Sequence, residues 1–165
     1  MLKNSVYIRI DKNYLQEVFI IPIFASEKQK KVINPKERKY IMATKFYKCA
    51  HCGNVIEKVV DSKVPVVCCG EKMQELVANT VDASTEKHVP VVTKIDDNTL
   101  KIEVGSVAHP MLPEHHIAFI YVETENGGTR INLTDTPEAI YCTCNGTPTA
   151  VYEYCNLHGL WKVEL

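Results

Sequence analysis

Cys155 and His158 lie three residues apart in the stretch "YCNLHGLW" (154–161), near the C-terminal end of the sequence. A thiol and an imidazole at this spacing are compatible with three kinds of chemistry. They can fill a core, act as a nucleophile with its general base, or provide two ligands of one metal ion. The rest of the sequence has to decide among these interpretations.

Two further motifs carry histidines. The stretch "EKHVPV" contains His88, and "HPMLPEHH" contains His109, His115 and His116. A single histidine on a strand is more often a hydrogen-bonded structural residue than a ligand. Taken together within one domain, these side chains and the Cys155 thiol can supply one metal site, because neutral imidazole is the commonest metal ligand in proteins.

A second candidate metal site consists of cysteines alone. "CAHC" contributes Cys49 and Cys52, and "CCG" contributes Cys68 and Cys69. A C-x-x-C turn directs two thiolates at one point, and a second pair completes a tetrahedral set that suits zinc or a single iron. Adjacent cysteines are unusual in zinc ribbons, so the metal stays open at this point. His51, inside the first turn, is expected to be exposed rather than a ligand.

The two groups of candidate ligands lie in segments of different composition. Residues 45–76 are dense in cysteine, and such a short segment needs a staple because it cannot build a core of its own. From about residue 79 onward, short runs rich in Val, Ile, Thr and Tyr alternate with turn clusters. These runs are "HVPVVTKI", "TLKIEVG", "HIAFIYVET", "TRINLTD" and "TAVYEYC". Short strands without helical periodicity favour an antiparallel sandwich or barrel.

The first 41 residues differ in charge from the rest. They carry nine Lys/Arg and four Asp/Glu, while the whole chain has a net charge of −1. We expect a solvated, basic N-terminal extension over 1–41; an arm that binds nucleic acid or membrane is the alternative. A further hypothesis is that natural translation starts at Met42, in "MATKFYKC". The domains predicted after it are 42–78 and 79–165.

The overall composition excludes some classes of protein. A near-zero net charge gives no reason to expect a nucleic-acid partner. The most apolar stretch, "VFIIPIF" (18–24), is shorter than the roughly 20 residues of a membrane span. Without a targeting signal, the expected compartment is the cytoplasm, where the seven cysteines are more readily metal ligands or redox groups than disulfides.

The cysteine segment resembles a known family. "FYKCAHCGNVIEKV" and "VVCCGEKM" are similar to the amino-terminal module of desulfoferrodoxins, the two-iron superoxide reductases. The resemblance continues through "EKHVPV", "HPM" and "CNLHGLW" and so covers about 44–165. It implies a desulforedoxin/rubredoxin-like module followed by a seven-stranded immunoglobulin-like sandwich, and thus an all-β chain. It implies one iron bound by Cys49, Cys52, Cys68 and Cys69, and a catalytic iron bound by His88, His109, His115 and His158, with Cys155 as the axial ligand.

The resemblance also implies an activity, the one-electron reduction of superoxide to hydrogen peroxide. Lys87 would offer positive charge to the incoming anion and orient water, and Glu86 would occupy the sixth position of the resting ferric iron. Electrons would come from rubredoxin or a similar carrier, and the protein would be a homodimer. A phosphate-binding glycine loop is missing from the sequence, so we do not expect a bound nicotinamide cofactor.

Two details depart from the family pattern. His115 and His116 are neighbours, and on a strand they would face opposite sides, so we predict His115 as the ligand and His116 as a structural residue. Cys142 and Cys144, in "YCTCNG", match no family ligand position. We expect them to be free thiols; the alternative is a redox-active or intermolecular pair.

Three other functions stay open from the sequence. The first is a non-enzymatic binding module stapled by zinc. The second is an electron carrier whose only active centre is the four-cysteine iron. The third is a dismutase, in which the oxidised metal would take an electron back from superoxide.

Overall fold

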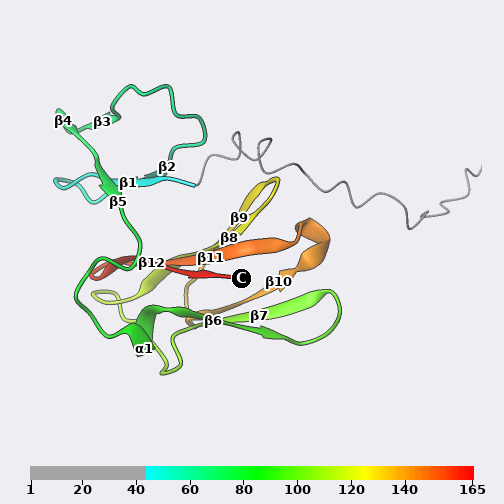
Figure 1. Cartoon of the computed structure of the whole chain (residues 1–165). Helices are drawn as coiled ribbons and strands as arrows, with labels where there is room; N and C mark the ends of the chain where they lie inside the picture. Colours follow the sequence, from blue (N-terminus) through cyan, green and yellow to red (C-terminus); the bar gives the residue numbers. More distant parts are fainter. Residues whose placement is uncertain (1–43) are drawn as a thin grey trace, which may run out of the picture. The chain divides into compact units, whose positions relative to one another are not determined.

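The computed structural model describes residues 44–165, whose regular secondary structure is almost all β-strand (Figure 1). The predicted extension 1–41 and the proposed start at Met42 lie outside the described residues. The cysteine-rich module contains β1 (Phe46–Lys48), β2 (Val55–Glu57), β3 (Val67–Cys68), β4 (Glu71–Lys72) and β5 (Gln74–Leu76). The elements that follow are α1 (Thr85–His88), β6 (Pro90–Lys94), β7 (Thr99–Val104), β8 (Ile117–Thr124), β9 (Gly127–Asn132), β10 (Glu138–Cys142), the 3-10 turn η2 (Thr143–Asn145), β11 (Pro148–Cys155) and β12 (Gly159–Glu164).

The second part of the chain is a sandwich of two antiparallel sheets. One sheet has the strand order β10-β7-β6, and the other has the order β12-β11-β8-β9. Figure 1 shows β6 and β7 facing β11 and β12. The predicted all-β chain, with a small cysteine module before a sandwich, is confirmed. Two of the strands, β10 and β12, lie outside the runs identified from the sequence, because each mixes apolar residues with charged or polar ones.

Strand β11 lies at the centre of the packing and is buried on both faces. Alternate residues of a strand point to opposite sides. Val151 and Cys155 therefore lie in the core between the sheets, while Ala150, Tyr152 and Tyr154 belong to a second apolar cluster on the outer face. Cys155 is thus held at the buried end of this strand.

The cysteine-rich module packs on that second cluster. Phe46 from β1 is 2% exposed and meets the rings of Tyr121 and Tyr152 edge-on, with centroids 5.2 and 5.9 Å away. The hydroxyl of Tyr121 donates a hydrogen bond to Glu57 of β2 at 2.7 Å. One aromatic side chain and a few polar contacts therefore anchor a segment that is too small for its own core.

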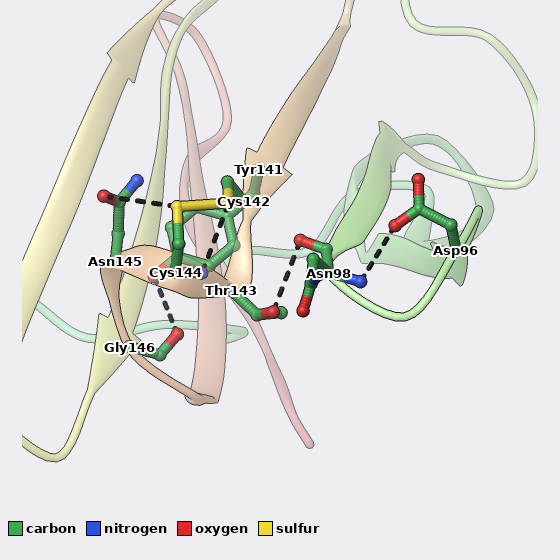
Figure 2. Close-up of a disulfide and its surroundings, with 8 residues drawn as sticks. All are labelled: Asp96, Asn98, Tyr141, Cys142, Thr143, Cys144, Asn145 and Gly146. Atoms are coloured by element: carbon green, nitrogen blue, oxygen red, sulfur yellow. Dashed lines mark hydrogen bonds between the residues drawn. A yellow bond between two sulfur atoms is a disulfide. The ribbon is translucent and has the colours of Figure 1, made fainter. Parts of the chain in front are cut away.

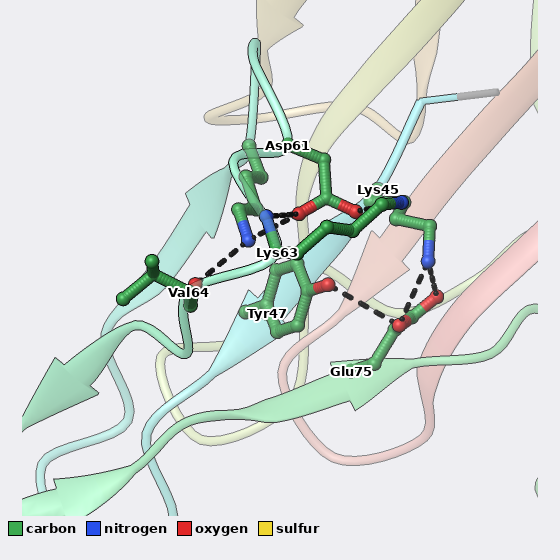
Figure 3. A network of polar contacts seen from close by, with 7 residues as sticks. Lys45, Tyr47, Asp61, Lys63, Val64 and Glu75 are labelled. Atoms are coloured by element: carbon green, nitrogen blue, oxygen red, sulfur yellow. Dashed lines mark hydrogen bonds and ion pairs between the residues drawn. The ribbon is translucent and has the colours of Figure 1, made fainter. Parts of the chain in front are cut away.

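Charged side chains arrange the loop that follows β2. Asp61 pairs with Lys58 at 2.6 Å and with Lys63 at 3.0 Å. Figure 3 shows Asp61 beside Lys63, and Tyr47 and Lys45 both contacting Glu75 on β5. The hydrogen bond from Lys58, followed by those from Lys63, holds the pKa of the Asp61 carboxyl well below its usual range. Polar contacts thus shape this loop where apolar burial is scarce.

Cys142 and Cys144 differ from what the sequence predicts. Cys142 and Cys144 are joined in a disulfide, so the prediction of free thiols is wrong for this pair, whereas the other five cysteines are free. The single intervening residue of a tight turn brings the two side chains together. Within residues 44–165 the helices are single turns, and none provides the apolar length that a membrane crossing requires.

Candidate metal centres

Four imidazoles form a closed ring at one end of the sandwich. His88 neighbours His109 and His158, and His115 neighbours the same two rings. Neighbouring ring centroids are 4.5–4.9 Å apart and the ring planes are 69–83° to one another. The Sγ atom of Cys155 lies 3.6 Å from His109 Nε2 and 3.5 Å from His158 Nδ1. All five donor atoms lie within 4.8 Å of one another, so a single ion can reach them together.

Different elements bring these residues to one place. His88 ends the single-turn helix α1, His109 and His115 lie in the loop between β7 and β8, and Cys155 ends β11. His158 follows in the turn to β12. The pairing of β11 with β8 shifts its register between Tyr154 and Cys155. Such an irregularity redirects a side chain, and it lies directly beside the candidate site.

Two backbone carbonyls determine which ring nitrogens face the centre. Nδ1 of His88 is 2.7 Å from the carbonyl oxygen of Ser84, and Nδ1 of His109 is 2.7 Å from that of Pro110. A carbonyl only accepts, so both Nδ1 atoms carry the proton and both Nε2 atoms keep a free lone pair. His158 differs, because it presents Nδ1 to His88 Nε2 at 3.0 Å. Three of the imidazoles thus each turn one ring nitrogen toward the shared centre.

The protonation states of the ring also suit a metal ion. Burial, with the charges of the neighbouring histidines, lowers the pKa of His109 to about 4 and also lowers the pKa values of His88 and His115. These imidazoles are therefore neutral at pH 7. Among the described residues, no hydrogen-bond partner reaches the buried Nε2 of His115. Burying a polar nitrogen without a hydrogen-bond partner costs free energy, and a cation bound to its lone pair would remove that cost.

Burial raises the pKa of the Cys155 thiol, although backbone N–H groups of His158 and Leu157 oppose the shift. Ionisation of this thiol inside the core therefore needs a cation beside it. Neutral imidazoles with one thiolate are a set that binds transition metals such as iron. The donor atoms present in this structure thus fit the iron that the family resemblance implies.

Lys87 and Glu86 lie on α1, immediately before His88, and both are exposed. The positive charge of Lys87 contributes to the lowered pKa values of His88 and His115. The Glu86 carboxylate instead accepts a hydrogen bond from the Ser84 hydroxyl, which lowers the pKa of Glu86. The field of Lys87 therefore acts on the imidazole ring, while the Glu86 carboxylate is not among the clustered donor atoms.

His116 and His51 lie outside both clusters. Nδ1 of His116 lies 3.0 Å from the carbonyl oxygen of Leu112, and its backbone N–H donates to the Asn156 side chain at 2.9 Å. The Asn156 amide also donates to the Glu114 carbonyl at 2.9 Å. Asn156 therefore ties the loop of His115 to the turn that follows Cys155. His51 is exposed.

The four cysteines of the module form the second cluster, with all sulfur atoms within 4.8 Å. Cys52 Sγ is 3.6 Å from Cys68 Sγ, which is 3.9 Å from Cys69 Sγ. Metal–sulfur bonds of about 2.3 Å in a tetrahedron require sulfur separations of about 3.8 Å. The backbone N–H of Cys52, the largest of several causes, lowers the pKa of Cys49 to about 6. These separations and this stabilised thiolate fit one tetrahedral ion.

Sequence reasoning missed three residues that lie near the candidate ligands. Trp161 stacks on His88, with centroids 4.9 Å apart, and its indole N–H donates to the His158 carbonyl at 3.1 Å. Glu153 is fully buried in the core, and burial raises its pKa to about 9. Gly105 lies against the backbone of α1. The only signal for Glu153 was a lone carboxyl inside an apolar run.

A ring of four histidines with one cysteine on a β-sandwich, together with a four-cysteine cluster in the preceding module, defines a protein with two candidate mononuclear metal sites. Comparison with known proteins agrees. Residues 80–164 match the sequence profile of the Desulfoferrodoxin family. The chain is 47% identical to the desulfoferrodoxin of Syntrophotalea carbinolica over 120 residues, which is 72% of this chain and 94% of that protein. The chain therefore belongs to the desulfoferrodoxin family.

Two further similarities support this assignment. The desulfoferrodoxin of Nitratidesulfovibrio vulgaris is 43% identical over 121 residues, which is 72% of this chain and 94% of that protein. The crystal structure of the superoxide reductase from Treponema pallidum superposes with a TM-score of 0.62 at 32% identity, covering 74% of this chain and all of that one. The shared fold thus includes more of the chain than the family profile matches.

Proposed function

We propose that the protein is a superoxide reductase, which converts superoxide to hydrogen peroxide at an iron held by His88, His109, His115, His158 and Cys155. The observation that carries this proposal is the closed ring of four imidazoles with the Cys155 sulfur against two of them. Membership of the desulfoferrodoxin family and the likeness to the Treponema pallidum superoxide reductase support the same activity.

The reaction adds one electron and two protons to a small anion. Bound iron would supply the electron and a cationic binding position. The neutral imidazoles leave the charge of the ion largely uncompensated, and Cys155, once ionised, contributes the one negative charge of the ligand set. Exposed Lys87, next to His88 in the sequence, adds a local positive charge, which would attract superoxide to a chain whose net charge is −1.

The proton steps would involve the exposed residues of α1, Glu86 and Lys87. Lys87 can hold water by hydrogen bonds at its ammonium group, and solvent reaches the same position. Glu86 would have to leave the Ser84 hydroxyl before it could act as the sixth ligand that the family resemblance implies. Its role in the resting ferric state is therefore a separable part of the proposal.

The Cys49–Cys52–Cys68–Cys69 site would hold the second iron, which makes two irons per chain. Rubredoxin or a similar carrier would be the electron donor, and the protein would be a cytoplasmic homodimer. The predicted boundaries, 42–78 for the module and 79–165 for the catalytic sandwich, complete the proposal. These points depend on the family resemblance and are independent of the chemistry at the histidine ring.

Product stoichiometry tests the activity. Superoxide generated by pulse radiolysis should give one hydrogen peroxide per superoxide consumed in the presence of an electron donor, with no oxygen released. A dismutase would release half of the superoxide as oxygen, and an electron carrier or zinc module would not accelerate the decay at all. Either result would contradict the proposal.

The role of Lys87 is tested by its neutral variant Lys87→Met. The rate constant for superoxide should fall and lose much of its dependence on ionic strength, because local positive charge steers the anion. Lys94→Met is the matched control, because Lys94 is an exposed lysine on β6 paired with Asp97. Equal rates for both variants would remove Lys87 from the mechanism.

A further inference from the structure

The Cys142–Cys144 pair lies outside both candidate metal centres. In Figure 2 the two sulfurs form a disulfide across one intervening residue, Thr143. Cys142 ends β10, and Cys144 lies in the turn η2 that precedes β11. Cys155 is the last of the eight residues of β11, a strand that begins shortly after this turn and corresponds to about 25 Å of extended chain. The pair is therefore a separate site.

Contacts that do not involve sulfur hold the turn. The backbone N–H of Thr143 donates to the Asn98 carbonyl at 2.8 Å, and the Gly146 N–H donates back to the Thr143 carbonyl at 3.0 Å. The Tyr141 hydroxyl donates to the Gly146 carbonyl at 3.0 Å (Figure 2). Because these contacts are independent of the S–S bond, the turn can keep its shape when the pair is reduced.

The held turn also presets the distance between the two cysteines. Their Cα atoms are 5.2 Å apart, inside the range that a disulfide spans without movement of the backbone. Oxidised and reduced states thus fit one backbone conformation. A pair that needs no rearrangement between its states is suited to repeated cycling.

The disulfide contributes little to the stability of the fold. A disulfide stabilises the fold by lowering the entropy of the unfolded chain, and this effect grows with the logarithm of the length of the loop that it closes. Here the loop contains only three residues. Strand β10 is already paired with β7 from Glu138 to Cys142. Since the fold does not depend on this bond, its accessible sulfur points to a redox role.

The two sulfurs have different surroundings. Cys144 is exposed, whereas Cys142 is half-buried and its Sγ accepts a hydrogen bond from the Cys144 backbone N–H at 3.3 Å. An N–H directed at sulfur stabilises the thiolate. Cys142 is therefore the better leaving group when an outside thiol attacks Cys144, and the better nucleophile when both thiols are free.

We propose that Cys142 and Cys144 form a dithiol–disulfide couple that hydrogen peroxide oxidises and a dithiol donor reduces. The Cys142 thiolate attacks one peroxide oxygen: an S–O bond forms, the O–O bond breaks, and the departing hydroxide takes up a proton to become water. Cys144 then loses its proton and attacks the sulfenic sulfur, forming the S–S bond and releasing a second water. Two thiols thereby give two electrons to one peroxide.

The return step consumes one dithiol. A donor thiolate attacks Sγ of Cys144, and the S–S bond to Cys142 breaks, leaving Cys142 as a thiolate. The second donor thiol displaces Cys144 and the donor leaves as its own disulfide, while both cysteines regain protons. The inference rests on the proposed function only for the source of peroxide, which superoxide reduction would produce in the same molecule.

Mass spectrometry of one peptide tests the couple in the full-length, iron-loaded protein. Cleavage after Glu138 and Glu153 isolates residues 139–153, whose only cysteines are Cys142 and Cys144. After dithiothreitol, this peptide should bind two iodoacetamide groups. After added hydrogen peroxide it should bind none and be lighter by two hydrogens, and renewed dithiothreitol should restore both thiols.

Two variants assign the roles of the sulfurs. In Cys144→Ser, peroxide should leave a sulfenic acid on Cys142 that dimedone captures, and Cys142→Ser should give several-fold less of this adduct on Cys144. Both variants should reduce superoxide at the wild-type rate. Thiols that stay alkylatable in peroxide, or a disulfide that resists dithiothreitol in the folded protein, would overturn the couple. Because the peroxide is added, failure of the superoxide assay would leave this result unaffected.

Discussion

Replacing Gly105, which is not a candidate ligand, by alanine should lower both the stability of the protein and its rate of superoxide reduction. Gly105 has φ of +78°, and a Cβ atom there would lie 2.6 Å from the Glu86 carbonyl oxygen and 2.7 Å from backbone atoms of Lys87. Ordinary contact begins at 3.4 Å, so the backbone of α1 would have to move by most of an ångström. No side-chain rotation relieves this overlap, because the atoms it meets are backbone atoms.

The size of the effect follows from two contributions. An alanine in the left-handed region costs about 1–2 kcal/mol, and forcing atoms into a packed site costs typically about 1–3 kcal/mol more. The free energy of unfolding should therefore fall by about 2–5 kcal/mol. Because α1 carries Lys87 and ends at the candidate ligand His88, a shift near 1 Å should also lower the superoxide rate by as much as about 100-fold.

Gly53→Ala is the matched control for the backbone contribution. Gly53 has φ of +77°, nearly that of Gly105, but nothing lies within 4 Å of its added Cβ. Urea denaturation should show only the smaller loss in this variant, and pulse radiolysis should give the wild-type rate with superoxide. If Gly105→Ala matches Gly53→Ala in both measurements, the contact with α1 does not position the site.

Two further predictions concern stability. The pKa of Glu153, raised to about 9 by burial, means that the folded protein keeps this carboxyl protonated while the unfolded chain ionises it above its model value of 4.5. Stability is thus lost as pH rises from 4.5 through 9, and Glu153→Gln should add about 3 kcal/mol at pH 7 but little at pH 4.5. Urea titrations of chelator-treated protein check this, and a difference independent of pH would refute it. Phe46→Ala should lower the free energy of unfolding by about 3–5 kcal/mol, because the ring is buried among aromatic residues. Val59→Ala, at an exposed position, is its control. An equally small loss of stability in both variants would show that Phe46 does not anchor the module.

The sequence could predict the composition of both candidate sites because their motifs are local. Cys155 and His158 come from one turn, and Cys49 and Cys52 from another. Resemblance to a family supplied the partners across the chain, such as His88. Spacing alone could not have shown that α1 and two distant loops meet, because that depends on how the sheets pack.

Other features had no local signal at all. The carbonyls of Ser84 and Pro110 that orient the imidazoles belong to the backbone, which every residue shares. Glu153 is buried because β11 is covered on both faces. A sequence that alternates apolar and polar residues predicts instead a strand with one exposed face. The disulfide of Cys142 and Cys144 depends on the turn that Asn98 holds from another hairpin.

The most direct test of the central claim is iron analysis with a visible spectrum on anaerobically purified protein, compared with Cys155→Ser. We expect two irons per chain, and a sulfur-to-iron absorption band of the oxidised protein that Cys155→Ser loses together with superoxide reduction. Cys142→Ser, as the control, should keep both properties. A colourless zinc protein, or a Cys155→Ser variant with an unchanged spectrum and rate, would contradict the assignment of the histidine ring and Cys155 as the iron site.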